Sequence, residues 1–334
     1  MKLSHRGLVA ALVGAVALVS LTACSGSSTG GGGSAASSAQ PIHVNVGYNG
    51  DGNGAMLEAI AEKQGIWKKH GLDVSAKQFT NGPLQIQALG TGDLDFGFIG
   101  PGALWLPMSG KAKIVAIEAL GTADRVIAQK GITSMKDLKG KTVGVPEGTS
   151  GDMLLSLALA NAGMSATDIK KVAMDAPTAI AAFTAGQIDA AAIWYPFVDQ
   201  IKQHKPDMVE VAKSADFPDL AFPSSIVAGN DIASKPEMLK RYQAGIKEAM
   251  TWAAAHKSEL PQLLSTFLKA PLESVKSEFA YVDVQPPKNL IEKWDSGIAP
   301  KWFENLNSEF IRMKKLDKAV DPHTYILFEE YKKA

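Results

Sequence analysis

Two structural junctions recur within the chain at nearly the same spacing and in the same order. Gly92–Ile99 matches Gly186–Ile193 at a shift of 94 residues, and each segment places an aspartate before an apolar run. The second junction is a strand end followed by a helix start, and it recurs at a shift of 97 residues. Its strand end, Val46-Gly47, matches Val143-Gly144, and its helix start, Gly54–Leu57, matches Gly151–Leu154. The repeat is too long and too seldom repeated for a solenoid. Chance similarity between Gly- and Ala-rich segments is the alternative, and we favour two similar α/β lobes.

Short apolar strands alternate with amphipathic helices from Ile42 to about Val227. The predicted strands are 42–48, 72–79, 94–99, 113–119, 126–129, 142–145, 171–174, 190–194 and 208–211. The predicted helices are 55–69, 83–91, 102–109, 134–138, 151–162, 177–185 and 196–204. Because strands that alternate with helices form parallel sheets, the pattern predicts an α/β fold in which each lobe is a mainly parallel sheet flanked by helices. From Lys235 onward the pattern is mostly helical.

The first forty residues have the features of an export signal followed by a tether. Lys2 and Arg6 flank the start of an apolar run, Gly7–Leu21, which as a helix would cover about 22 Å against a hydrocarbon core of about 30 Å. Leu-Thr-Ala-Cys, which ends at Cys24, resembles the lipobox of bacterial lipoproteins, and Cys24 is the only cysteine. We therefore expect a signal peptide over 1–23, lipidation of Cys24 and a flexible Gly/Ser tether over 24–40. A buried structural cysteine is the alternative.

Charge and length exclude some function classes. Without Lys2 and Arg6, 32 basic residues remain against 34 acidic ones, and no basic run is present, which argues against nucleic acid binding. The chain that follows the signal is long enough for two domains. No later stretch is long and apolar enough to cross a membrane, so we expect the rest to be soluble and monomeric.

Gly-rich loops follow the predicted strands of both lobes, where open α/β sheets bind ligands. Amides at the helix starts attract anions, and glycine lets the backbone approach a ligand closely. An aromatic residue at a strand end can form a flat wall of the site. The residues that we expect to contact a ligand are Asn49, Gly50, Asn81, Gly100, Pro101, Gly102, Glu147, Thr149, Ser150, Trp194 and Tyr195. For Thr149 and Ser150, helix capping is an equally good interpretation, and Trp194 could belong to the core.

Catalytic, nucleotide and metal chemistry find little support in the sequence. The loop at 49–54 lacks the lysine of a phosphate loop and does not give the dinucleotide pattern. The histidines show no metal-ligand spacing, and no serine lies in a nucleophile elbow. We expect no catalytic residue, no metal and no cofactor. Asp95 and Asp189 occupy equivalent places in the repeat, and we expect them to cap turns.

The scarcity of arginine bears on the ligand. Only Arg125 of the four arginines lies near a predicted lobe crossing, so an anionic head group would rely on amides and hydroxyls. Asp51, Glu147 and Asp152 flank the same loops and could receive an ammonium group, although solvated loop acids are the commoner outcome. A zwitterion such as taurine would suit both the amides and hydroxyls, which could bind its anionic group, and the acidic loop residues, which could bind its ammonium group.

Residues 42–230 resemble the solute-binding proteins of nitrate, sulfonate and taurine ABC importers. The resemblance is carried by Gly82-Pro83, Gly92–Gly97, Leu138–Pro146, Gly186–Ala190 and Trp194-Tyr195-Pro196. It implies a two-lobe, type II periplasmic-binding-protein-like fold, with crossings near 120–125 and 220–226 and C-terminal helices on the first lobe. Lobe 1 would be 41–121 plus 225–334, and lobe 2 would be 122–224. The family often has an acidic or amide residue at Pro101 and an aspartate at Tyr195.

The resemblance implies an extracytoplasmic, membrane-anchored lipoprotein that binds a small anionic or zwitterionic solute, similar to a sulfonate or taurine, by hinge closure. Its partners would be an ABC importer permease and the ATPase of that permease. Carboxylate, nitrate and pyrimidine remain alternative solutes. The pyrimidine-forming enzymes of thiamine biosynthesis share this fold, but the clustered cysteines of that family are absent here. A receptor or adhesin is a further alternative.

Overall fold

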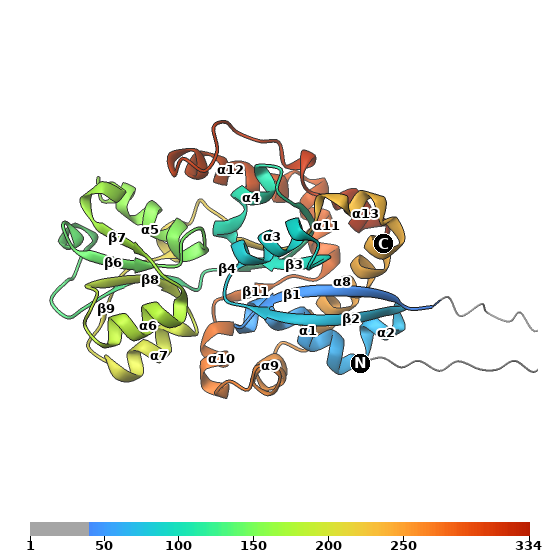
Figure 1. Ribbon diagram of the computed structural model, residues 1–334, viewed down its shortest axis with the longest axis horizontal. Helices are drawn as coiled ribbons and strands as arrows, with labels where there is room; N and C mark the ends of the chain where they lie inside the picture. Colours follow the sequence, from blue (N-terminus) through green and yellow to red (C-terminus); the bar gives the residue numbers. More distant parts are fainter. Residues whose placement is uncertain (1–39) are drawn as a thin grey trace, which may run out of the picture. The chain divides into compact units, whose positions relative to one another are not determined.

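Two mixed β-sheets, each flanked by helices, make up residues 40–334, which are the part of the chain that the computed structural model describes (Figure 1). The predicted signal peptide, Cys24 and almost all of the tether lie outside the described residues. The larger sheet has six strands, in the spatial order β11 (Val282–Val284), β4 (Lys113–Gly121), β10 (Pro223–Ala228), β3 (Phe96–Ile99), β1 (Ile42–Asn49) and β2 (Leu72–Phe79). The smaller sheet has five, in the order β7 (Lys170–Ala173), β6 (Thr142–Val145), β8 (Ala190–Trp194), β5 (Asp124–Ala128) and β9 (Val209–Lys213).

Helices connect the strands and cover the sheets. Those that precede residue 205 are α1 (Gly52–Gln64), α2 (Ile66–Lys69), α3 (Gly82–Thr91), α4 (Trp105–Met108), α5 (Ser150–Asn161), α6 (Ala176–Thr184) and α7 (Phe197–His204). The C-terminal helices are α8 (Pro236–Ala255), α9 (Leu260–Leu268), α10 (Leu272–Phe279), α11 (Pro287–Asp295), α12 (Ile298–Arg312) and α13 (Phe328–Lys333). Single 3₁₀ turns occupy 101–103, 135–138, 166–168, 214–216, 230–234 and 322–324. Within residues 40–334 no helix has the length and apolar character that crossing a membrane requires.

The α/β class is confirmed, and the predicted strands and helices lie within a few residues of the observed ones. The helix predicted over 55–69 is divided, because Gly65 adopts a left-handed conformation that ends α1 and precedes α2. The helix predicted over 102–109 is a 3₁₀ turn followed by the short α4.

The predicted mainly parallel character is confirmed for strand direction, since four of the six strands in the larger sheet and four of the five in the smaller one run the same way, but the pairing of neighbouring strands is mixed. β1 pairs in parallel with β2 and β3, and β6 with β7 and β8. β10, however, runs antiparallel to β3 and β4, β11 runs antiparallel to β4, and β5 runs antiparallel to β8 and β9. The reason is the path of the chain: β5 and β10 each follow a passage of the chain from one sheet to the other, and each begins beside the carboxyl end of its neighbour, so it runs back in the opposite direction.

The two matched junctions of the sequence make matching hydrogen bonds. The Asp95 carboxylate accepts a bond from the backbone amide of Asn45 at 3.0 Å, and the Asp189 carboxylate accepts one from Thr142 at 2.8 Å. In the other direction, the backbone amides of Asp95 and Asp189 donate to the carbonyls of Asn45 and Thr142. Asp95 therefore fixes β3 beside β1, and Asp189 fixes β8 beside β6.

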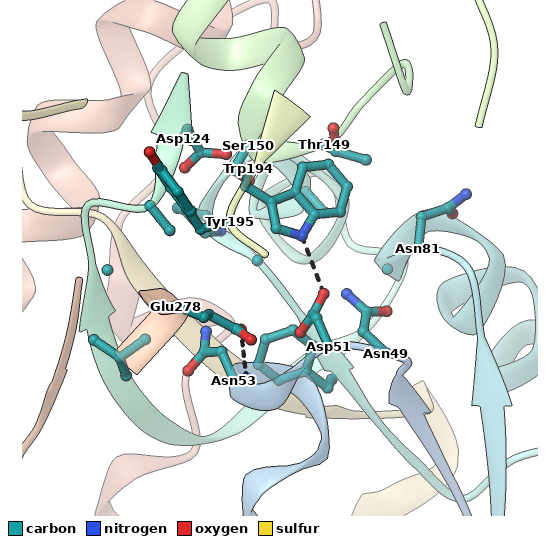
Figure 2. A pocket seen from close by; sticks show the side chains of 18 of the residues that line it. Asn49, Asp51, Asn53, Asn81, Asp124, Thr149, Ser150, Trp194, Tyr195 and Glu278 are labelled. Atoms are coloured by element: carbon teal, nitrogen blue, oxygen red, sulfur yellow. Dashed lines mark hydrogen bonds between the residues drawn. The ribbon is translucent and has the colours of Figure 1, made fainter. Parts of the chain in front are cut away.

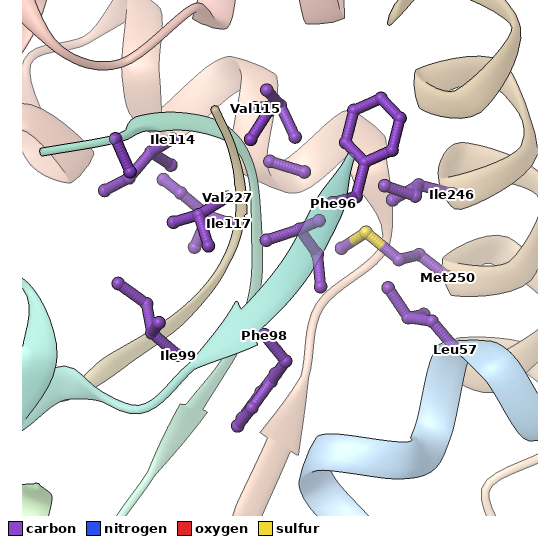
Figure 3. Packing of buried hydrophobic residues seen from close by; sticks show 14 of the residues in the cluster. Leu57, Phe96, Phe98, Ile99, Ile114, Val115, Ile117, Val227, Ile246 and Met250 are labelled. Atoms are coloured by element: carbon purple, nitrogen blue, oxygen red, sulfur yellow. The ribbon is translucent and has the colours of Figure 1, made fainter. Parts of the chain in front are cut away.

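The larger sheet packs its apolar side chains against the C-terminal helices. Figure 3 shows Phe96 of β3 facing Ile246 and Met250 of α8, with Leu57 of α1 beside them; all four are buried. The Phe96 ring also stacks on Tyr242 with ring centroids 3.8 Å apart. The smaller sheet has a buried cluster on each face, one that includes α5 and one that includes α6 and α7.

A buried acid lies at the edge of this core. Glu58 of α1 is 5% exposed, and its carboxylate accepts a bond from Trp67 Nε1 at 3.1 Å. Burial raises the pKa of Glu58 to about 7, against the lowering effect of the bonds from Trp67 and Tyr242. Because the ordinary pKa is 4.5, the folded state keeps this proton between about pH 4.5 and 7 while the unfolded state loses it.

Stability should therefore fall as the pH rises through that window. We expect the thermal midpoint to drop by several degrees between pH 5.5 and 8, since Glu58 contributes about 2 kcal/mol over the part of the window above pH 5.5, at about 1.36 kcal/mol per pH unit. Glu58→Gln keeps an acceptor for Trp67 and removes the titration, so its midpoint should depend less steeply on pH. Calorimetry of both proteins across the range checks this, and equal slopes would contradict it.

Candidate functional site

A small cavity lies where the carboxyl ends of β1, β3, β6 and β8 face one another (Figure 2). Its volume of about 60 Å³ corresponds to a few water molecules. Both sheets contribute to its wall, together with α10. The lining residues are Asn49, Asp51, Asn53, Asn81, Gly82, Pro83, Phe98, Gly100, Pro101, Ala103, Gly121, Ala123, Asp124, Thr149, Ser150, Trp194, Tyr195, Glu278 and Val282.

The backbone amides at the start of α1 donate hydrogen bonds to carboxylates of the protein. Asp51 is the N-cap, and its Oδ1 accepts a bond from the Gly54 amide at 2.8 Å. Glu278 of α10 accepts one bond from the Gly52 amide and one from the Asn53 amide, both at 2.8 Å. These are the groups with which a helix start would bind an anion. At α1, side chains of the protein already fill that position.

The two sheets are joined across the cavity by one side-chain bond. Trp194, at the end of β8, donates from its indole Nε1 to Asp51 Oδ2 at 3.1 Å, as Figure 2 shows. Trp194 is 8% exposed, and its ring meets Phe197 edge to face at 5.5 Å. Asp51 thus caps α1 with one oxygen and binds the other sheet with the second.

Asn49 is held by a residue that the sequence did not single out. Its side-chain oxygen accepts a bond from Gln85 Nε2 at 2.8 Å, and Gln85 in turn accepts one from the Phe98 amide. Gln85 is fully buried. The arrangement directs the amide nitrogen of Asn49 toward the cavity (Figure 2). Asn81 caps α3 through its side-chain oxygen, which accepts a bond from the Leu84 amide at 3.0 Å.

Polar groups of the loop before α5 form hydrogen bonds with other groups of the protein. Thr149 is the N-cap residue, but its hydroxyl donates to the Pro146 carbonyl at 2.6 Å rather than accepting from the helix. The Gly148 amide donates to Asp152, which also pairs with Lys171 at 2.6 Å. The charge of Asp152 is therefore balanced by Lys171, and Asp152 is not among the lining residues.

Asp124, at the start of β5, is a lining residue that the sequence did not reveal. It is 5% exposed, and its Oδ1 has no hydrogen-bond partner within residues 40–334, while Oδ2 lies 3.5 Å from the Ser214 hydroxyl. Burial raises its pKa to about 6, against the lowering effects of Ser150, Arg125 and Ser214.

The neighbouring Arg125 points away from the cavity. Its guanidinium donates to the Glu210 carboxylate at 2.9 Å and to the carbonyls of Thr122 and Asp124. It also lies over the Tyr281 and Tyr195 rings, at 4.5 and 5.1 Å from their centroids. Arg125 is not among the lining residues, and its charge is paired with Glu210 beside the connection between β4 and β5.

The cavity is acidic. Asp51, Asp124 and Glu278 are buried lining residues, and no lysine, arginine or histidine lines the wall within residues 40–334. Burial raises the pKa of Asp51, and burial together with the charge of Asp51 raises the pKa of Glu278 well above its usual range. The same part of the chain has no cluster of three or more His, Cys, Asp or Glu side chains that could hold a metal ion.

Eight of the eleven residues predicted to contact a ligand line this cavity: Asn49, Asn81, Gly100, Pro101, Thr149, Ser150, Trp194 and Tyr195. Gly50, Gly102 and Glu147 do not. Gly50 packs against Gln78, Gly102 packs on the backbone of Thr149, and Glu147 pairs with Lys315 at 3.4 Å. Ligand contact by the eight stays a prediction. The residues that the sequence missed, above all Asp124 and Glu278, carry most of the charge of the wall.

Comparisons with known proteins agree on one family. The family model described as NMT1/THI5 like matches residues 56–260. A protein from Brucella abortus (strain 2308), named "Putative binding protein", is 48% identical over 295 residues, which are 88% of this chain and 92% of that protein. The taurine-binding periplasmic protein of Escherichia coli (strain K12) is 28% identical over 169 residues, 49% of this chain and 52% of its own.

Solved structures share the fold. The alkanesulfonate-binding protein SsuA from Xanthomonas axonopodis pv. citri, bound to MOPS, superposes with a TM-score of 0.69 and 20% identity, over 86% of this chain and 99% of its own. The desulfurization enzyme DSZB superposes with a TM-score of 0.62 and 13% identity, over 87% and 98%. The fold alone therefore does not separate binding from catalysis.

Proposed function

This chain belongs to the NMT1/THI5-like family, and from that membership we propose that it is the solute-binding component of an ABC importer. It captures a small solute in the cavity between two lobes and delivers it to the permease and its ATPase. The observation that carries the proposal is a cavity formed by the strand ends of both sheets and bridged by the Trp194–Asp51 bond. The names of two relatives, a taurine-binding periplasmic protein and a putative aliphatic sulfonates-binding protein, support it.

We propose hinge closure as the mechanism. Lobe 1 comprises 41–121 plus 225–334, lobe 2 comprises 122–224, and the crossings near 120–125 and 220–226 act as the hinges. A solute that contacts both lobes binds the closed form better and shifts the equilibrium toward it. The close approach of Gly102 to the backbone of Thr149 supports a closed form whose lobes fit tightly together.

We propose that the solute is sulfonate-like or taurine-like, with carboxylates, nitrate and pyrimidines as alternatives. The names of two relatives, a taurine-binding protein and an aliphatic sulfonates-binding protein, support this class. A thermal-shift screen of the purified protein against sulfonates, nitrate, carboxylates, amino acids and pyrimidines tests the function. Stabilisation by a member of the panel is expected, and no response to any of them would contradict the proposal.

The proposed role is binding without catalysis, because the relatives are named as binding proteins. Prolonged incubation with a bound solute should return it unchanged by mass spectrometry, whereas turnover would favour an enzyme.

We further propose export by residues 1–23, lipidation at Cys24 and a monomer on the extracytoplasmic face of the membrane. Cys24→Ser should then release the protein from the membrane fraction, and its retention there would contradict the anchor.

Trp194→Ala should weaken solute binding at least tenfold, because it removes a flat wall of the cavity and the bond to Asp51. The variant should remain folded, since Trp194 lies at the cavity edge. Trp252→Ala is the control: this half-buried tryptophan stacks on His256, away from the lining residues. Calorimetry with a solute from the screen checks both variants, and an unchanged affinity would remove Trp194 from the site.

Gly102→Ala should hinder closure, because the added Cβ would overlap the Thr149 carbonyl and the Ser150 amide, which are backbone groups. We expect at least a tenfold loss of affinity and a larger radius of gyration by small-angle scattering at saturating solute. Gly90→Ala is the matched control, since nothing lies within 4 Å of its added Cβ. Gly102→Ala protein that closes and binds like the control would contradict the proposed closure.

A further inference from the structure

We infer that the solute carries a positively charged nitrogen group, an ammonium or an amidinium, which binds at the acidic wall formed by Asp124, Asp51 and Glu278. The inference rests on the proposed function and narrows its solute class. It separates zwitterions and cations from solutes whose only charge is negative.

The first step is the occupation of the anion position in lobe 1. Gly52, Asn53 and Gly54 donate their amides to Glu278 and Asp51 at 2.8 Å each. A sulfonate or nitrate could bind there only by displacing a buried carboxylate that belongs to the fold. Because like charges repel strongly where water is excluded, such an anion would also raise the energy of both acids.

The second step is the balance of charge in the wall. Three carboxyl side chains line the cavity, and the lining residues within 40–334 include no basic side chain. The nearest arginine in the sequence, Arg125, is turned to Glu210 and to backbone carbonyls. Lys171 is paired with Asp152, and Lys315 with Glu147. A cation supplied by the solute would therefore have no competitor from the protein.

The third step is the pair of acceptors left without donors. Asp124 Oδ1 and Asn53 Oδ1 are both buried, and neither has a hydrogen-bond partner in the described part of the chain. Both residues line the cavity (Figure 2). A buried acceptor without a partner costs free energy that a donor from the solute recovers. An ammonium or amidinium supplies several N–H donors from one charged group.

The remaining polar groups allow the rest of the solute to be neutral or anionic. The amide nitrogens of Asn49 and Asn81 belong to the wall and can donate. A taurine-like zwitterion would place its ammonium at Asp124 and its anionic end at these neutral donors. An alkanesulfonate lacks the group that the acidic wall attracts.

A matched panel tests the inference on the wild-type protein by calorimetry. One arm holds taurine, β-alanine, agmatine and guanidine; the other holds 2-hydroxyethanesulfonate, 3-hydroxypropionate, ethanesulfonate and nitrate. We expect the binders to belong to the first arm, with each hydroxyl analogue at least tenfold weaker than its amine. An anion without a cationic group that binds as tightly as any amine would overturn the inference and leave the proposed function intact. Binding of no member of either arm would overturn the inference, while the wider thermal-shift screen decides the proposed function.

Asp124→Asn tests the position of the group. It should lower the affinity for the best cationic binder at least tenfold, and Asp207→Asn, which removes an exposed carboxylate of the same lobe, should leave it unchanged. A cooperative thermal transition establishes that both variants fold. Asp124→Asn protein that binds like the control would overturn the assignment of the acidic wall. Should that variant not fold, the comparison of amine and hydroxyl solutes on the wild-type protein decides the inference alone.

Discussion

The binding of two protein carboxylates at the start of α1 is the interaction on which the rest of this structure depends. Glu278 lies 226 residues after Gly52 in the chain, and its bonds to the Gly52 and Asn53 amides attach the C-terminal helices to the first helix of the fold. Asp51 caps the same helix and also accepts the bond from Trp194 of the other sheet. One helix terminus therefore holds α10 against α1, joins the two sheets and contributes two of the three acids of the cavity wall.

The internal repeat explains why the cavity lies between the sheets. Asp95 makes its bonds to β1 and Asp189 makes the same bonds to β6, so the strand ends and the helix starts that follow are placed alike. The two copies differ in how their helix starts are used. In the first copy both carboxylates line the cavity, whereas in the second Asp152 is paired with Lys171. The acidity of the wall therefore comes from Asp51 of the first copy, from Glu278 of α10 and from Asp124 of β5.

Local patterns were sufficient to predict most of the elements. Alternating apolar residues and glycines at strand ends located most strands and helices within a few residues, and the repeated junction predicted the two similar halves. The strands β10 and β11 were not predicted, and the direction of β5 could not be predicted in this way, because it depends on how the chain passes between the sheets. The antiparallel β5 and the parallel β8 are both buried along their whole length, so their apolar patterns do not distinguish their directions.

The site residues that belong to a local sequence motif could be predicted, whereas those that reach the site through contacts between distant parts of the sequence could not. Asn49, Thr149 and Trp194 end strands or begin helices, so their place at the cavity follows from the local pattern. Glu278 looks like any acid on an amphipathic helix, and Gln85 like any polar residue of α3, until the chain folds. Asp124 could have been suspected as an acid at the very start of a buried strand.

The most direct measurement of the central claim is a titration of the side-chain carboxyl groups of the solute-free protein by carbon NMR, with Asp51, Asp124 and Glu278 assigned by substitution. The account predicts that all three titrate above the usual values of about 3.9 for aspartate and about 4.3 for glutamate. It also predicts that Asp51→Asn moves the pKa of Glu278 back toward that range, because the two charges repel. Three carboxyl groups that titrate independently at or below the usual values would contradict an enclosed acidic wall.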